Sequence, residues 1–74
     1  MGGNTIRRSR FKVESVDSSG QEFTIEHTKV FMVGDELYDQ YYETEDGEPV
    51  KENEDGSFKI LLPTETVIVR RVQG

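Results

Sequence analysis

The chain contains no cysteine and no tryptophan, and it has a single histidine and two prolines in 74 residues. Without cysteine, neither a disulfide nor a thiolate zinc site can staple the fold. No stretch reaches the roughly 18 apolar residues of a membrane span, and residues 1–6 lack the apolar segment of a signal peptide. Because only 32% of the residues are apolar, the core must be small. We expect one domain over residues 1–74, located in the cytoplasm.

The usual residues of catalysis are scarce as well. Nucleophilic catalysis needs a hydroxyl or thiol beside an oriented base, and the only histidine, His27, stands alone at the end of an expected strand. Such a histidine is more often packed or solvated than catalytic. The glycines at the expected turns stand singly, and no glycine precedes a Lys-Ser or Lys-Thr pair. The carboxylates do not have the spacing of a calcium-binding loop. We expect no enzyme activity and no catalytic, cofactor or metal site.

Charge is distributed unevenly along the chain. Residues 34–58 hold one basic and ten acidic residues, whereas the two flanking segments are slightly basic, which gives a net charge of −6. This acidic block is expected to be a solvated surface. Residues 44–56 are expected to form a mobile acidic turn region, because they hold too little apolar area to offset the entropy of ordering. Residues 1–5 are expected to be disordered.

Alternating apolar and polar residues predict β-strands. Five strands are expected, at residues 7–15, 21–28, 37–44, 57–62 and 67–72, with residues 49–51 as a short extended piece between two Asp-Gly turns. No apolar period of 3.6 residues is sustained, so no α-helix longer than about one turn is expected. Within each of three strands, every second residue is expected to face inward. These residues are Phe11, Val13, Phe23, Ile25, Phe58, Ile60 and Leu62.

Two short motifs carry a resemblance to a known fold family. Residues 31–37, Phe-Met-Val-Gly-Asp-Glu-Leu, form an apolar, Gly-Asp, apolar turn, and residues 62–67, Leu-Pro-Thr-Glu-Thr-Val, form a proline-containing turn before the last strand. In these motifs the chain resembles SH3-like small β-barrels, which implies an all-β, five-stranded antiparallel barrel or meander. An OB-like barrel and an open sheet are alternatives. Binding of proline-rich peptides is not implied, because Glu65 and Thr66 stand where SH3 domains have a groove-lining aromatic residue.

These patterns favour binding as the function. The leading interpretation is a small accessory or regulatory domain that binds another protein with a basic surface. Its carboxylates could imitate the phosphates of a nucleic acid, and exposed tyrosines would anchor the contact. The expected site residues are Asp35, Glu36, Tyr38, Asp39, Tyr41, Tyr42, Glu43 and Glu45.

Two alternative functions belong to other classes. The first is a structural subunit that completes its small core by oligomerising. The second is a nucleic-acid-binding barrel, in which neighbouring first and last strands would form a basic ridge from Arg8, Arg10, Lys12 and Arg70. The negative net charge disfavours nucleic acid, and we expect these arginines to pair with nearby carboxylates instead. No membrane partner is expected.

Overall fold

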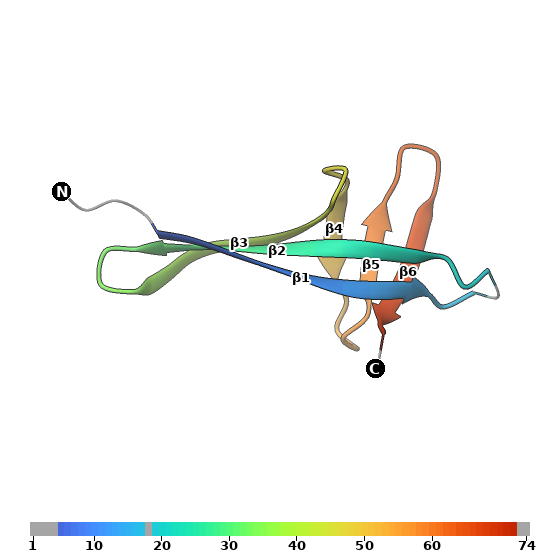
Figure 1. Cartoon of the computed structure of the whole chain (residues 1–74), viewed down its shortest axis with the longest axis horizontal. Coiled ribbons are helices and arrows are strands. Elements are labelled where there is room, and N and C mark those ends of the chain that lie inside the picture. The colour runs from blue at the N-terminus through green and yellow to red at the C-terminus, as the bar shows by residue number, and fades with distance from the viewer. Residues whose placement is uncertain (1–4, 18, 73–74) are drawn as a thin grey trace.

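The computed structural model describes residues 5–17 and 19–72, and these residues form strands and turns without a helix (Figure 1). The strands are β1 (Thr5–Ser15), β2 (Glu22–Met32), β3 (Glu36–Thr44), β4 (Pro49–Glu52), β5 (Phe58–Leu61) and β6 (Thr66–Arg71). Each strand pairs antiparallel with the next, and β1 also pairs with β6, which closes the sheet into a barrel. The predicted small antiparallel barrel is confirmed, and the open-sheet alternative is excluded. No helix in the described part of the chain could cross a membrane.

The predicted number of five strands was wrong, because the structure has six. The additional strand is β4, which was expected to be only an extended piece between turns and which pairs with both β3 and β5. Its single apolar residue, Val50, is 7% exposed and belongs to the core. Four residues with one apolar side chain show too little alternation to be recognised as a strand from the sequence.

Hydrogen bonds close the turns on both sides of β4. The Thr44 hydroxyl accepts a bond from the Glu48 N–H at 3.0 Å, and the Asn53 N–H donates to the Ser57 carbonyl at 2.8 Å. The expected mobility of residues 44–56 stays a prediction, which amide order parameters as high as those of the barrel strands would contradict. Of the residues expected to be disordered, 1–4 lie outside the described residues, and Thr5 begins β1.

The core lies inside the barrel, and the predicted inward-facing residues point into it. The buried apolar residues are Val13, Ile25, Val50, Phe58, Ile60, Val67 and Val69, and the predicted inward residues Phe11, Phe23 and Leu62 are partly buried against them. Side chains two residues apart share a face of a strand, so this set follows directly from the alternation. The second strand is longer than predicted, because it continues past Thr28 to Met32.

Three strands continue beyond the barrel as a projecting arm (Figure 1). β6 pairs with β1 only at Val13–Ser15, and β4 pairs with β3 only at Tyr42 and Glu43, so the remaining lengths of β1, β2 and β3 pair only among themselves. We define the arm as residues 5–8 and 28–41. The molecule is correspondingly elongated, with extents of 50 × 29 × 21 Å.

Candidate functional site

The tip of the arm is a tight turn between β2 and β3. The Asp35 N–H donates to the Met32 carbonyl at 3.1 Å, and both Gly34 and Asp35 have positive φ, 93° and 61°. Glycine adopts positive φ without steric cost, and aspartate is among the few other residues that tolerate it. The Gly-Asp pair was predicted to turn the chain, and both of its residues adopt positive φ.

A β-bulge lies close to this tip on β3. Val30 is opposite Asp39 and Phe31 is opposite Leu37, so Tyr38 is left without a partner on β2. A bulge bends the strand and increases its twist. The Tyr38 side chain is 65% exposed, which makes it one of the most accessible aromatic groups in the described residues.

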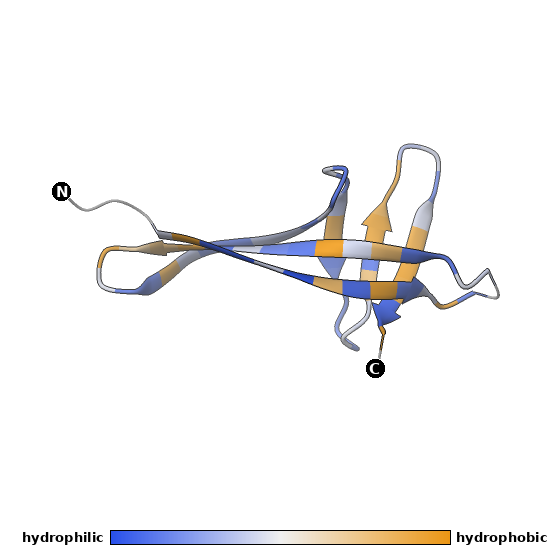
Figure 2. Cartoon of the chain, viewed as in Figure 1, coloured by the Kyte–Doolittle hydropathy of each residue, from blue (hydrophilic) through white to orange (hydrophobic). Residues whose placement is uncertain are grey.

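Exposed apolar side chains are concentrated on the arm. Eight large apolar or tyrosine side chains are exposed among the described residues, and six of them belong to the arm: Ile6, Met32, Val33, Leu37, Tyr38 and Tyr41. Figure 2 shows the corresponding apolar segment at the end of the arm, far from the core. The other two, Val16 and Val72, lie outside the arm. Scattered exposed apolar residues are normal, whereas their concentration on one projecting element makes the arm the candidate functional site of this chain.

Oppositely charged residues follow the two outer strands of the arm on the same face. Residues opposite each other on paired strands share a face, and the register aligns Arg8 with Thr28 and Thr28 with Tyr41. On this face β1 carries a basic row, defined as Arg8, Arg10 and Lys12, and β3 carries an acidic row, defined as Glu36, Asp39 and Glu43. Both rows begin on the arm and continue onto the barrel.

The central strand β2 supplies one carboxylate between these rows. Glu26 accepts a hydrogen bond from Arg10 Nε at 3.1 Å and lies 3.9 Å from Arg8 Nε. Within the described residues, the ion pairs shorter than 4 Å do not involve the acidic row. The neighbouring Thr28 is 1% exposed, and its hydroxyl has no hydrogen-bond partner. The carboxylates of the acidic row are therefore not offset by an ion pair within the described residues.

The opposite face of the arm has a different chemistry. Arg7, Lys29 and His27 line a shallow depression of about 310 Å³, and the Arg7 guanidinium lies 5.5 Å from the centre of the Phe31 ring. A cation over an aromatic face is attracted by the ring's quadrupole. This cation–aromatic pair was not anticipated from the sequence, because Arg7 and Phe31 are far apart in the chain.

His27 is packed where the arm meets the barrel. Its ring stacks on Tyr42 with centroids 4.1 Å apart, and its Nε2 lies 3.0 Å from the side-chain oxygen of Gln40. These contacts agree with the interpretation of His27 as a packed side chain.

Tyr42 was expected to be exposed, and this expectation was wrong. Its ring lies 5.0 Å from that of Phe58 and 6.2 Å from that of Phe11, so Tyr42 is half-buried and packs against the core. Burial raises the pKa of the Tyr42 hydroxyl, and the carboxylate of Glu52 adds to this effect, while Arg71 opposes it. The three tyrosines look alike in the sequence, but the register turns Tyr42 inward and Tyr41 outward.

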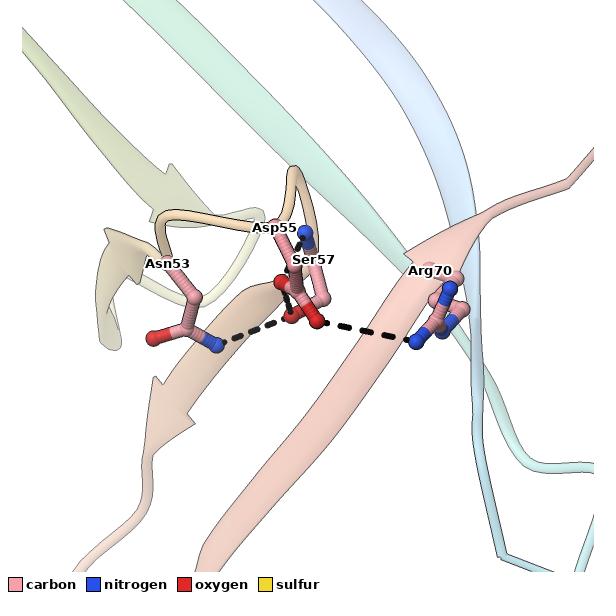
Figure 3. Close-up of polar contacts among 4 residues, drawn as sticks. All are labelled: Asn53, Asp55, Ser57 and Arg70. Carbon is pink, nitrogen blue, oxygen red and sulfur yellow. Dashed lines mark hydrogen bonds and ion pairs between the residues drawn. The ribbon is translucent and has the colours of Figure 1, made fainter.

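A second polar cluster joins the turn between β4 and β5 to β6 (Figure 3). The Ser57 hydroxyl donates to Asp55 Oδ1 at 2.5 Å and accepts from Asn53 Nδ2 at 3.0 Å, while Arg70 lies 3.6 Å from Asp55. The bonds from Ser57 are the main cause that lowers the pKa of the Asp55 carboxyl, and Arg70 contributes. Ser57 is only 3% exposed, and its hydrogen bonds to Asn53 and Asp55 hold the turn in place.

The four residues of the predicted basic ridge lie on one face of the sheet, but most of them are close to carboxylates. The first and last strands are neighbours, and the alignment of Arg70 with Glu14 puts Arg70 on the same face as Arg8, Arg10 and Lys12, while its guanidinium approaches Asp55. Arg8 and Arg10 approach Glu26. Three of the four ridge residues therefore have a carboxylate nearby, as expected for a charged strand face.

The predicted protein-binding residues are divided by the structure. Asp35, Glu36, Tyr38, Asp39, Tyr41 and Glu43 follow one another along the arm tip and β3. Glu45 lies apart from them in the next turn, where its N–H donates to the Thr24 carbonyl at 3.3 Å. Four exposed residues of the arm were not anticipated from the sequence: Ile6, Met32, Val33 and Leu37. The apolar run of residues 30–33 beyond the expected strand end was the available signal.

Clusters of three or more potential metal ligands do not occur within residues 5–17 and 19–72. Comparison of the chain with models of known protein families, with curated proteins and with solved structures found no match.

Proposed function

We propose that this chain is a non-catalytic accessory or regulatory domain that binds another protein through its arm. The observation that carries the proposal is the exposure of six large apolar or tyrosine side chains on one projecting element, while the apolar residues of the barrel strands are buried or partly buried. Exposed apolar groups gain most from being covered by a partner. Tyr38 and Tyr41 suit this role, because tyrosine combines a large apolar ring with a polar tip and is frequent at interface hot spots.

The acidic row indicates the chemistry of the partner. Glu36, Asp39 and Glu43 share one face, and their carboxylates are not engaged by an arginine or lysine among the described residues. A complementary surface would be basic, since opposite potentials speed association and suppress unsuitable partners. Imitation of nucleic-acid phosphates by this row is one form of the same proposal.

Site-specific photo-crosslinking tests the proposal. A benzophenone amino acid placed at Tyr38 should form covalent adducts with protein in cells of the source organism. The same probe at Val16, which is also well exposed (52%) but lies outside the arm, should not. Adding Leu37→Ser to the Tyr38 probe should lower the yield several-fold, because the neighbouring apolar contact is lost. Absence of adducts at Tyr38, or equal yields at both positions, would exclude the arm as the binding surface.

A further inference from the structure

Both outer strands of the arm have an unpaired edge. Beyond their short pairing with β6 and β4, the outer sides of β1 over residues 5–11 and of β3 over residues 36–41 face no other strand within the described part of the chain. An unpaired edge presents backbone N–H and C=O groups that can bind a further strand. Charged side chains at such edges usually prevent this, because like charges meet when identical edges approach.

The charges of the arm disfavour only some of the edge-to-edge contacts that two copies of this chain could make. A two-fold dimer would bring β1 beside β1, or β3 beside β3, and each contact would place charges of one sign together. The basic row of β1 and the acidic row of β3 are instead complementary, and they lie on the same face of the sheet. Residues of opposite charge that are neighbours across strands stabilise the pairing.

We propose that the arm binds a second copy of this chain, with the β1 edge of one copy beside the β3 edge of the next. This inference rests on the proposed function, since it names the partner of the same arm. The contact is heterologous, so each copy keeps one edge available for another copy. It places Arg8 and Arg10 of one copy near Asp39 and Tyr41 of the next, along the part of β3 that is regular after the bulge at Tyr38.

Strand direction and molecular shape constrain this assembly further. β1 and β3 both run antiparallel to β2, so keeping the charged rows on one face makes the strands of neighbouring copies parallel. The barrel is wider than the arm, so successive copies must be inclined to avoid a clash between barrels (Figure 1). A heterologous series that curves in this way closes into a ring or continues as a helix.

The test is sedimentation velocity of the full chain over a wide range of concentration, with charge reversals on each edge. Arg8→Glu reverses one charge of the basic row and Asp39→Arg reverses one charge of the acidic row, so each places two like charges opposite each other at the proposed contact, while Arg10 keeps its bond to Glu26. Each reversal alone should raise the concentration needed for association by about tenfold or more. An equimolar mixture of the two variants, and the chain carrying both reversals, should associate again. Circular dichroism checks that every variant is folded, and high salt should weaken the association.

A wild-type chain that stays monomeric at all concentrations would overturn the inference. A dimer that survives either reversal would also overturn it, since it would point to a two-fold contact outside the charged edges. Failure of the mixture to associate after both single variants have dissociated would exclude the complementary pairing. If the Tyr38 probe captures only a different protein while the chain is monomeric, the proposed function stands and this inference fails.

Discussion

At the scale of single residues, Phe58 is the largest fully buried side chain of the barrel. Its ring lies 5.3 Å from that of Phe11 and 5.0 Å from that of Tyr42, so it joins the barrel interior to the mouth beside the arm. Truncation to alanine would remove apolar contact area and leave a cavity that a closed barrel cannot easily fill.

We expect Phe58→Ala to lower the free energy of unfolding by about 3 to 5 kcal/mol. Because so small a domain has little stability to lose, most molecules of this variant should be unfolded. Lys59→Ala, at the next position on the opposite face of β5, should cost less than about 0.5 kcal/mol. Chemical denaturation followed by circular dichroism measures both. A Phe58→Ala chain as stable as the wild type would contradict the observed core.

A substitution at Thr28 is expected to raise the free energy of unfolding rather than lower it. The Thr28 hydroxyl is buried in the central strand without a hydrogen-bond partner, and an unsatisfied polar group costs free energy that an isosteric methyl does not. Thr28→Val should therefore raise the free energy of unfolding by roughly 0.5 to 1 kcal/mol. Thr66→Val, at an exposed position of β6, is the matched control and should change it little. A destabilised Thr28→Val chain would indicate that the hydroxyl is satisfied in solution.

At the scale of elements, the turn between β4 and β5 depends on one carboxylate. Asp55 accepts hydrogen bonds from both the N–H and the hydroxyl of Ser57, which holds the start of β5 in place. Because these bonds favour the charged carboxylate, the pKa of Asp55 in the folded chain is below its ordinary value of 3.8. The stabilisation is thus fully present above the unfolded pKa and is lost as the pH falls through the folded pKa.

We expect Asp55→Asn to be less stable than the wild type at neutral pH, with the difference shrinking at acidic pH as the wild-type carboxylate becomes protonated. The midpoint of urea denaturation, measured from neutral pH to below about pH 3, shows this directly. Glu54→Gln, in the same turn, should leave the midpoint nearly unchanged at every pH. A pH-independent difference for Asp55→Asn would mean that its charge does not stabilise the turn.

At the scale of the whole molecule, the net charge of −6 controls which polyanions can approach. Affinity for nucleic acid comes largely from summed contacts between cations and phosphates. Arg8, Arg10 and Arg70 approach carboxylates of their own chain, so the positive charge of these three arginines is partly offset before a phosphate approaches. The barrel and the acidic row together repel a phosphate backbone.

We expect DNA and RNA to bind weakly or not at all at physiological salt, as measured by fluorescence anisotropy with single- and double-stranded probes. Sub-micromolar, salt-sensitive binding that is lost in an Arg8→Ala, Arg10→Ala chain would contradict this. Binding lost instead in an Arg7→Ala, Lys29→Ala chain would assign nucleic acid to the other face of the arm.

Patterns among residues that are close together in the sequence were sufficient to predict much of the fold. The alternation around Val13, Ile25 and Ile60 determined which side chains face inward, and Gly34-Asp35 and Pro63 determined where the chain turns, because both effects act between close neighbours in the sequence. Most of the predicted binding residues also lie together, since they are consecutive on one strand.

The rest was decided only by contacts between distant segments. Pairing of β1 with β6 closes the barrel, pairing of β4 with two neighbours makes it a strand, and the register of β2 with β3 turns Tyr42 inward. The arm exists because β1, β2 and β3 are longer than the strands with which they close the barrel. No local sequence pattern determines this difference in length. By itself the sequence determined the faces of the strands and the charges upon them. The tertiary pairing of segments far apart in the chain decided which strand edges remain unpaired. It also placed the opposite charges of these edges on one face of the sheet.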